Sequence, residues 1–115
     1  MSLYSETILT TQTHPGDSTV ESVTGSNFKG DGYYGRSDGF HTVQYAVTGF
    51  IGDIVIQATL AIEPTEEDWF PVLNYSFVVP TDLSGVDNFI GNYVWIRAKI
   101  ETWTDGSVNS VILNH

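Results

Sequence analysis

A two-residue alternation of apolar and polar side chains is the feature that most constrains how this sequence can fold. It is clearest between residues 53 and 63, where five apolar side chains share one face: Ile54, Ile56, Ala58, Leu60 and Ile62. The same period recurs over residues 40–48 and 92–103. Successive side chains of a β-strand point to opposite faces of the sheet, so the pattern predicts long strands. No long stretch has the spacing of an amphipathic helix.

Turn-forming residues separate these runs. Gly49 to Asp53 reads as a tight connection. Asp105-Gly106, between two alternating runs, predicts a hairpin because glycine accepts a positive φ. Residues 69–75 read as a strand in which Pro71 limits the early pairing, and Pro80 interrupts again, so residues 77–79 are at best an edge piece. The sequence therefore predicts an all-β fold, an antiparallel two-layer β-sandwich of jelly-roll type with about six to eight strands.

The length and the glycine distribution indicate one domain with a distinctive first third. A chain of 115 residues suits a single domain, residues 1–115, with one modest core. Residues 1–30 could form edge strands or an extended N-terminal arm. Gly25 to Gly39 carries five glycines around Tyr33 and Tyr34, which predicts a long ordered loop. Loops of this length inside compact domains are usually functional or packed on another segment.

The charge balance excludes several classes of partner. Four basic residues stand against fourteen acidic ones, a net charge of −10, so binding to nucleic acid or to anionic membranes is disfavoured. The absence of cysteine excludes disulfides, thiolate metal sites and a cysteine nucleophile. The first residues do not resemble a signal peptide, and no apolar run is long enough to cross a bilayer.

Residues 93–103 present two unlike faces. One face is aliphatic or small and is expected to point into the core: Val94, Ile96, Ala98, Ile100 and Thr102. The other face mixes aromatic and charged side chains: Tyr93, Trp95, Arg97, Lys99, Glu101 and Trp103. Charges in the middle of a face are costly to bury, so this second face is expected to be wetter.

Two explanations account for tryptophans on a wet face. The N-terminal segment or a loop could lie across Trp95 and Trp103, with the stems of Arg97 and Lys99 covering the rings. Alternatively the face is a partner surface, since Trp, Tyr and Arg carry most interface energy, and a sugar-stacking platform is one form of it. The candidate interaction surface consists of Tyr33, Tyr34, Trp69, Tyr93, Trp95, Arg97 and Trp103.

The residues show no pattern typical of catalysis, a metal or a cofactor. His41 lies in a predicted strand and reads as a packed residue, whereas His14 is expected in a flexible stretch. Glu66, Glu67 and Asp68 read as a charged, solvated loop, because glycoside hydrolysis needs two acids held across a cleft. Oxygen ligands for calcium occur in glycine-bearing loops at Asp31, Asp38, Asp82 and Asp87, without the spacing of a calcium-binding loop.

Three stretches carry a resemblance to a known group of proteins. The first is DGYYGRSDGFHTV, Asp31 to Val43. The second is GDIVIQATL, Gly52 to Leu60, followed by EPTEEDWF from Glu63 to Phe70. The third is GNYVWIRAKI, Gly91 to Ile100, continuing into TDGSVNSV from Thr104 to Val111. Together, over residues 31–113, they resemble a small β-sandwich domain of structural proteins from T4-like marine tailed phages, including cyanophages.

The resemblance implies a non-enzymatic virion protein. It implies a role in assembly, capsid decoration or attachment through a tail fibre or neck, in the virion after assembly in the host cytoplasm. Expected partners are further copies of the chain, with a trimer as one form, and other virion proteins. The alternative is a carbohydrate-binding module for host recognition, because exposed aromatic rings stack on sugars and acidic groups bond hydroxyls. No catalytic residue, metal or cofactor follows from the resemblance.

Overall fold

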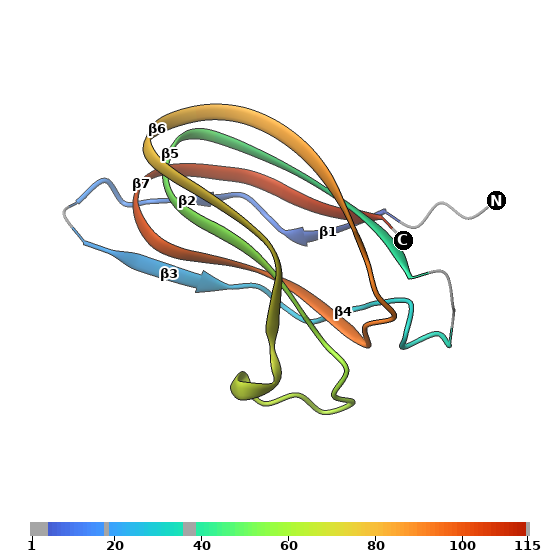
Figure 1. The fold of residues 1–115 in the computed structure, drawn as a ribbon. Helices are drawn as coiled ribbons and strands as arrows, with labels where there is room; N and C mark the ends of the chain where they lie inside the picture. The colour runs from blue at the N-terminus through green and yellow to red at the C-terminus, as the bar shows by residue number, and fades with distance from the viewer. Residues whose placement is uncertain (1–4, 18, 36–38, 115) are drawn as a thin grey trace.

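The computed structural model describes residues 5–17, 19–35 and 39–114 and is built almost wholly of strands (Figure 1). The elements in chain order are β1 (Ser5–Leu9), β2 (Gln12–Thr13), β3 (Glu21–Thr24), β4 (Phe28–Lys29), β5 (Phe40–Thr59), the 3-10 helix η1 (Glu66–Asp68), β6 (Phe70–Ile90) and β7 (Trp95–Asn114). All strand pairs are antiparallel and belong to one seven-stranded sheet. The prediction of an all-β antiparallel fold is confirmed.

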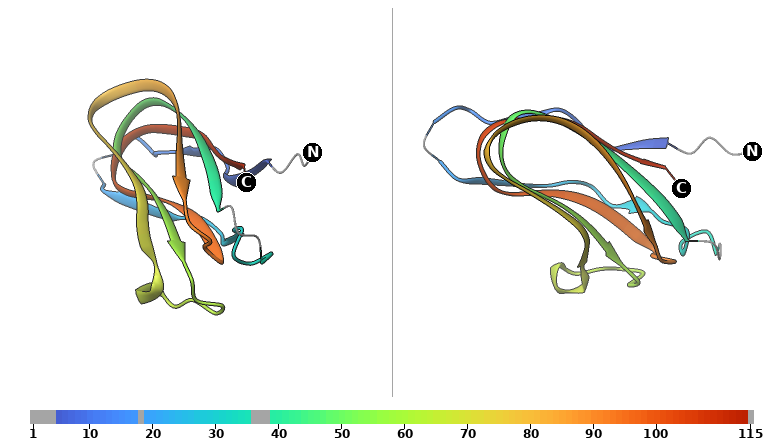
Figure 2. Two further views of the ribbon diagram at one scale, coloured as in Figure 1. Left: turned by 45° about the vertical axis from the view of Figure 1, so that its right-hand side comes forward. Right: turned by 45° about the horizontal axis from the view of Figure 1, so that its top comes forward.

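The sheet folds over on itself to make the two layers of a sandwich. The strand order is β1-β7-β5-β6, and the three long strands each curve through a U-shaped bend (Figures 1 and 2). The first layer joins β1 and β2 to the C-terminal half of β7 and the N-terminal half of β5. The second layer joins β3 and β4 to the N-terminal half of β7 and the C-terminal half of β5.

Glycines at the bend let the backbones of β5 and β7 approach each other closely. Gly49 has φ 57° and Gly106 has φ 82°, a left-handed conformation that favours glycine. A side-chain carbon added at Gly106 would lie 2.1 Å from the backbone oxygen of Gly49. The predicted turns at residues 49–53 and 105–106 are therefore wrong: these residues bend the continuous strands β5 and β7. Asp105-Gly106 forms no hairpin, because both halves of β7 are already paired with β5.

The core lies between the two layers. Alternating side chains of β5 fill it, with Val43, Ile54 and Ile56 fully buried. Opposite them on β7 lie Ile96 and Ile100, also fully buried. The alternation stops at the end of β5, however: Leu60 and Ile62, expected on the buried face, are 68% and 79% exposed because they lie beyond the last residue of the strand.

One strained residue moves a tryptophan into this core. Thr102 has φ 51°, which is unfavourable for a β-branched residue, and the pairing register of β5 and β7 shifts beside it. The shift breaks the two-residue alternation, so Thr102 is exposed and Trp103 is only 2% exposed. Trp103 therefore packs in the core against Phe50, at a centroid distance of 6.5 Å. The expectation of Trp103 on a wet face and Thr102 in the core is wrong.

The two edges of the sheet are formed by different kinds of strand, short ones at one edge and a long one at the other. The short strands of residues 5–29 line one side, all paired with β7. On the other side β6 is the last strand in the order and runs through both Pro71 and Pro80. Proline removes a backbone donor, and an edge strand tolerates this because its outer donors have no partner strand. No helix of the described residues is long and apolar enough to cross a membrane.

Candidate functional site

The outer face of the second layer collects most of the predicted surface residues. Lys29 of β4 is the register partner of Trp95 on β7, and Arg97 is the partner of Gln57 on β5. Directly opposed residues point to the same face of a sheet, and residues two apart on one strand do the same. Lys29, Trp95, Arg97 and Gln57 therefore share a face that looks away from the core.

Exposed aromatic rings form a cluster at one end of this face, here named the aromatic platform and made of Lys29, Tyr33, Tyr34 and Trp95. The Tyr33 ring lies 5.2 Å from Trp95 and 5.5 Å from Tyr34, measured between centroids. Tyr33 is 46% and Tyr34 is 44% exposed, and Trp95 is half-buried. The ammonium nitrogen of Lys29 lies 4.5 Å from the centre of the Tyr33 ring, a cation–π contact.

Arg97, next on the same face, is covered by the chain's own loop. Its guanidinium lies over Trp69, with the central carbon 4.2 Å from the ring centroid, and the Arg97 side chain is only 4% exposed. Both terminal nitrogens donate to Glu66, at 3.1 and 2.9 Å, and the Nε atom donates to Gln57 at 2.7 Å. The hydrogen bonds and the charge of Arg97 hold the pKa of Glu66 below its ordinary value of 4.5.

The loop of residues 60–69 is thereby attached to the face at two points. Glu66 and Trp69 hold Arg97, and the indole nitrogen of Trp95 donates to the backbone oxygen of Ile62 at 2.9 Å. The loop projects from the end of the second layer (Figures 1 and 2). The expectation that residues 66–68 form a merely solvated loop is thus incomplete, because Glu66 makes a bidentate ion pair with a buried arginine.

A hollow of about 350 Å³ is lined in part by this loop. Two ring side chains and two carboxylates contribute to its wall, and its lining residues are Thr59, Leu60, Ala61, Glu67, Asp68, Phe70 and Tyr93. Tyr93 packs with Phe89 at a centroid distance of 6.2 Å, so its ring lies on this side of the sandwich end and not in the platform. Phe70 and the hollow were not singled out from sequence.

The predicted surface residues are therefore divided between three places. Tyr33, Tyr34 and Trp95 form the platform, and Arg97 with Trp69 forms the covered strip beside it. Tyr93 lines the hollow, and Trp103 is in the core. The idea that a loop covers part of the face thus applies to Arg97 and in part to Trp95, which is half-buried and bonded to Ile62 of the loop. The idea of an exposed surface applies to Tyr33 and Tyr34.

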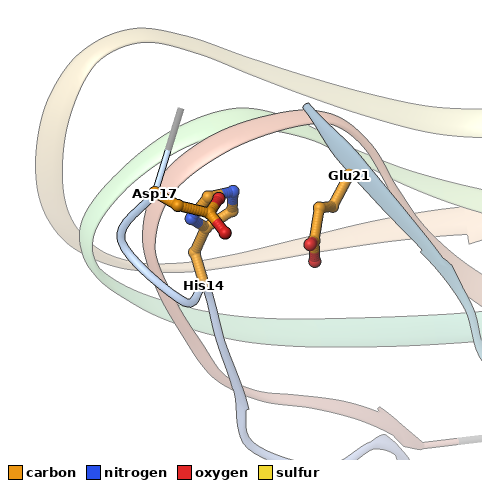
Figure 3. A group of neighbouring side chains, drawn as sticks. All are labelled: His14, Asp17 and Glu21. Carbon is orange, nitrogen blue, oxygen red and sulfur yellow. The ribbon is translucent and has the colours of Figure 1, made fainter. Parts of the chain in front are cut away.

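Three potential metal ligands, His14, Asp17 and Glu21, lie close together between β2 and β3 (Figure 3). His14 Nδ1 accepts from the backbone N–H of Gly16 at 3.0 Å, and Nε2 donates to the backbone oxygen of Thr19 at 3.1 Å. Both ring nitrogens are thus engaged within the chain.

The remainder of this cluster is structural as well. The Thr19 hydroxyl and amide donate to Asp17 and lower its pKa. His14, expected in a flexible stretch, is 5% exposed and contacts the Trp103 ring edge-on at 5.2 Å. The cluster therefore anchors the segment between β2 and β3 to the bend of β7.

The aspartates considered as calcium ligands are engaged separately, and Asp82 and Asp87, expected in loops, lie within strand β6. Asp82 accepts from the backbone N–H of Gly49 at 2.6 Å, and Asp87 accepts from the Tyr75 hydroxyl at 3.1 Å. Asp31 is buried, and Asp38 lies outside the described residues.

His41, expected as a packed strand residue, is fully buried. Its ring stacks on Phe89 at 4.8 Å, and its Nδ1 donates to the backbone oxygen of Gly39 at 2.8 Å. These contacts make His41 part of the core.

No protein-family model matches the sequence, and no curated protein matches it. Among solved structures, the fold is similar to CBM29_1, a family 29 carbohydrate-binding module from Piromyces equi. The TM-score is 0.52, with 8% identity over 97% of this chain and 91% of that chain. The likeness is one of fold.

Two further solved structures are less similar. A carbohydrate-binding module of lichenase 5A from Cellvibrio mixtus, in complex with cellotriose, has a TM-score of 0.42 and 14% identity over 96% of this chain and 98% of that chain. The K3 adhesin domain of Lys-gingipain from Porphyromonas gingivalis has a TM-score of 0.47 and 6% identity over 82% of this chain and 61% of that chain.

Proposed function

We propose that the chain is a non-catalytic carbohydrate-binding module that binds glycan on the aromatic platform. The observation that carries the proposal is the cluster of the exposed Tyr33 and Tyr34 with the half-buried Trp95 on the outer face of a sandwich layer. Aromatic faces pack against the apolar face of a sugar ring, and the tyrosine hydroxyls and Lys29 supply polar contacts at the rim. The similar fold of the Piromyces equi module supports the same class of function.

The platform is ordered before any ligand arrives. Trp95 is fixed by its hydrogen bond to Ile62, and Tyr33 is held between Trp95, Tyr34 and the ammonium of Lys29. Rings that are already positioned lose little side-chain freedom on binding, which favours affinity. The wet, aromatic character that the sequence predicts for this face is thus suited to hydroxyl-rich ligands.

The test is titration calorimetry of the purified chain with neutral hexasaccharides of glucose, mannose and xylose and with the hexamer of galacturonic acid. Tyr34→Ala and Trp95→Ala are expected to weaken binding at least about tenfold, which corresponds to about 1.4 kcal/mol. Phe40→Ala is the matched control, because Phe40 is a 49% exposed ring that begins β5 and is not part of the platform. Absence of binding to every sugar, or equal binding by all variants, would contradict the proposal.

A second proposal is the virion role implied by the sequence resemblance, and one observation favours it. The outer edge of β6, 21 residues long, carries exposed apolar side chains such as Val78 and Val86, at 86% and 67%. Long exposed edges readily pair with another chain. In this proposal, copies of the chain join through β6 into a homo-oligomer, such as a trimer, and contact other virion proteins.

Light scattering at high concentration and detection of the chain in purified virions test this second role. A monomer under all conditions together with absence from virions would exclude it. Val86→Lys, which places a charge on the free edge, is expected to reduce self-association without affecting glycan binding.

A further inference from the structure

The hollow beside η1 has the lining of a sugar subsite. We propose that it binds a neutral sugar residue of the same glycan that lies on the aromatic platform, an inference that rests on the proposed carbohydrate-binding function. The hollow has a volume of about 350 Å³ and is open to solvent at the end of the second layer. Its lining comes from loop residues and from the ends of β5 and β6.

Its lining combines apolar side chains with hydrogen-bond acceptors. Phe70 is 64% and Leu60 is 68% exposed, an unusual exposure for large apolar side chains that lie together. The Tyr93 ring contributes a second aromatic surface. The carboxylates of Glu67 and Asp68 stand beside these groups. A sugar ring has both an apolar face and a hydroxyl edge, so this combination matches its two sides.

The carboxylates of Glu67 and Asp68 differ in how many hydrogen-bond acceptor positions remain available for a ligand. Asp68 Oδ2 already accepts from the backbone N–H and the hydroxyl of Thr65, at 2.7 and 3.1 Å, which fixes the side chain. Glu67 makes no hydrogen bond or ion pair with any residue that the structure describes, and it is exposed. Glu67 is therefore the acceptor available for hydroxyl groups, with Asp68 held rigidly next to it.

The charge of the hollow selects against acidic sugars. Arg97 is the cation attached to this loop, and it is covered by Trp69 and paired with Glu66. An incoming carboxylate or sulfate group would thus meet Glu67 and Asp68 with no cation among the hollow's lining residues. The carboxylate of a uronic acid would be repelled by the carboxylates of Glu67 and Asp68. A uronic acid residue is therefore disfavoured in the hollow, and a neutral sugar residue is preferred.

The hollow and the platform are close enough to be used together. Thr59, which lines the hollow, is the register partner of Trp95, which belongs to the platform. The loop between the two sites is fixed by the Trp95 hydrogen bond and by Arg97. A linear oligosaccharide that covers Trp95 can therefore extend around the loop into the hollow, and two linked contacts raise the affinity more than either alone.

The experiment compares oligosaccharides of increasing length in titration calorimetry. The probes are neutral β-linked oligomers of glucose, mannose and xylose with two to six residues, and the galacturonic acid hexamer. Glu67→Gln and Phe70→Ala are expected to lower affinity for the neutral hexamer about tenfold, the effect of a lost charged hydrogen bond or ring contact. The disaccharide, which reaches the platform alone, is expected to bind all of these variants equally.

Glu63→Gln is the matched control, because Glu63 is an exposed carboxylate of the same loop that does not line the hollow. Glu67→Gln is also expected to relieve the discrimination against the galacturonic acid hexamer, which Glu63→Gln leaves unchanged. Thermal unfolding of Phe70→Ala checks that the variant is folded.

The outcomes separate the two sites. If Trp95→Ala loses binding while Glu67→Gln and Phe70→Ala bind every oligomer like the wild type, the subsite is overturned and the platform stands. If the hollow variants lose binding and Trp95→Ala keeps it, the hollow is the binding site and the platform proposal fails. If the wild type binds none of these sugars, both are overturned.

Discussion

The guanidinium of Arg97 lies over the ring of Trp69, with its central carbon 4.2 Å from the ring centroid, while its two terminal nitrogens bind Glu66. Arg97 is 4% exposed, and the Glu66 side chain is 76% exposed. The arginine therefore joins the surface of the sheet to the loop that borders both proposed sugar sites. By holding this loop in place, Arg97 also fixes the positions of Glu67 and Asp68, which the loop carries.

Replacing Arg97 by lysine tests this arrangement. Lysine is charged but cannot form the ring contact, the bidentate pair and the Gln57 hydrogen bond together. We expect Arg97→Lys to lower the free energy of unfolding by about 1–3 kcal/mol, measured by urea denaturation. Lys99→Gln is the control: its pair with Glu101 at 3.2 Å is partly exposed, so the loss is expected below about 0.5 kcal/mol. Equal effects of the two changes would contradict the role given to Arg97.

The pH dependence of stability follows from Glu66. Arg97 lowers the pKa of Glu66 in the folded chain below its ordinary value of 4.5, so the unfolded state binds the proton more readily. The contribution of the pair is thus fully present above that ordinary value and is lost as the pH falls through the folded pKa. Urea denaturation from pH 7 to pH 2 is expected to show a smaller acid-induced loss in Glu66→Gln than in the wild type. Parallel pH profiles of the two proteins would argue against this pairing.

Gly106 tests the contact between the two bends. Gly106→Ala would place a carbon 2.1 Å from the backbone oxygen of Gly49 and would also strain a residue at φ 82°. We expect a loss of about 3 kcal/mol or more, because the backbone has to move. Gly16 has φ 79° and open space around it, so Gly16→Ala isolates the conformational cost, expected at about 1 kcal/mol. Thermal or urea unfolding of both variants measures the difference.

Thr102 is expected to be replaceable with a gain in stability. Its φ of 51° is costly for a β-branched side chain, and asparagine tolerates this conformation better. We expect Thr102→Asn to raise the free energy of unfolding by about 0.5–1 kcal/mol. Thr24→Asn, at an exposed position of strand β3 where Thr24 pairs with Lys99, is expected to lower it, because asparagine is a poor strand former. A destabilised Thr102→Asn variant would indicate that the threonine makes a compensating contact.

The strands were predictable because their signal is local. Alternation over residues 40–48 and 53–59 correctly indicates strands, and the apolar face of residues 53–59 places Ile54 and Ile56 in the core. The connectivity was not predictable in the same way. The Asp-Gly pair correctly indicates a positive φ at Gly106. Whether the chain then reverses or continues depends on which strands lie beside it in the fold. Here β5 accompanies β7 through the bend, so the strand continues.

The candidate site was half predictable for a related reason. The aromatic character of the face and the exposure of Tyr33 and Tyr34 follow from composition and loop position. The burial of Arg97 depends on Glu66, which is 31 residues earlier in the chain and is brought over the sheet by a loop. Trp103 escaped prediction because a single strained residue, Thr102, reverses the alternation just before it.

The bending of one sheet into both layers has a consequence for how the chain folds. Each of the three long strands belongs to both layers, so neither layer has a long strand of its own from which to form separately. Nearly all pairing is between residues distant in sequence, as with Ser5 and Asn114, and such topologies fold slowly, in milliseconds to seconds. Backbone amides of the two layers are therefore expected to exchange with solvent together, through a single cooperative opening of the whole sandwich.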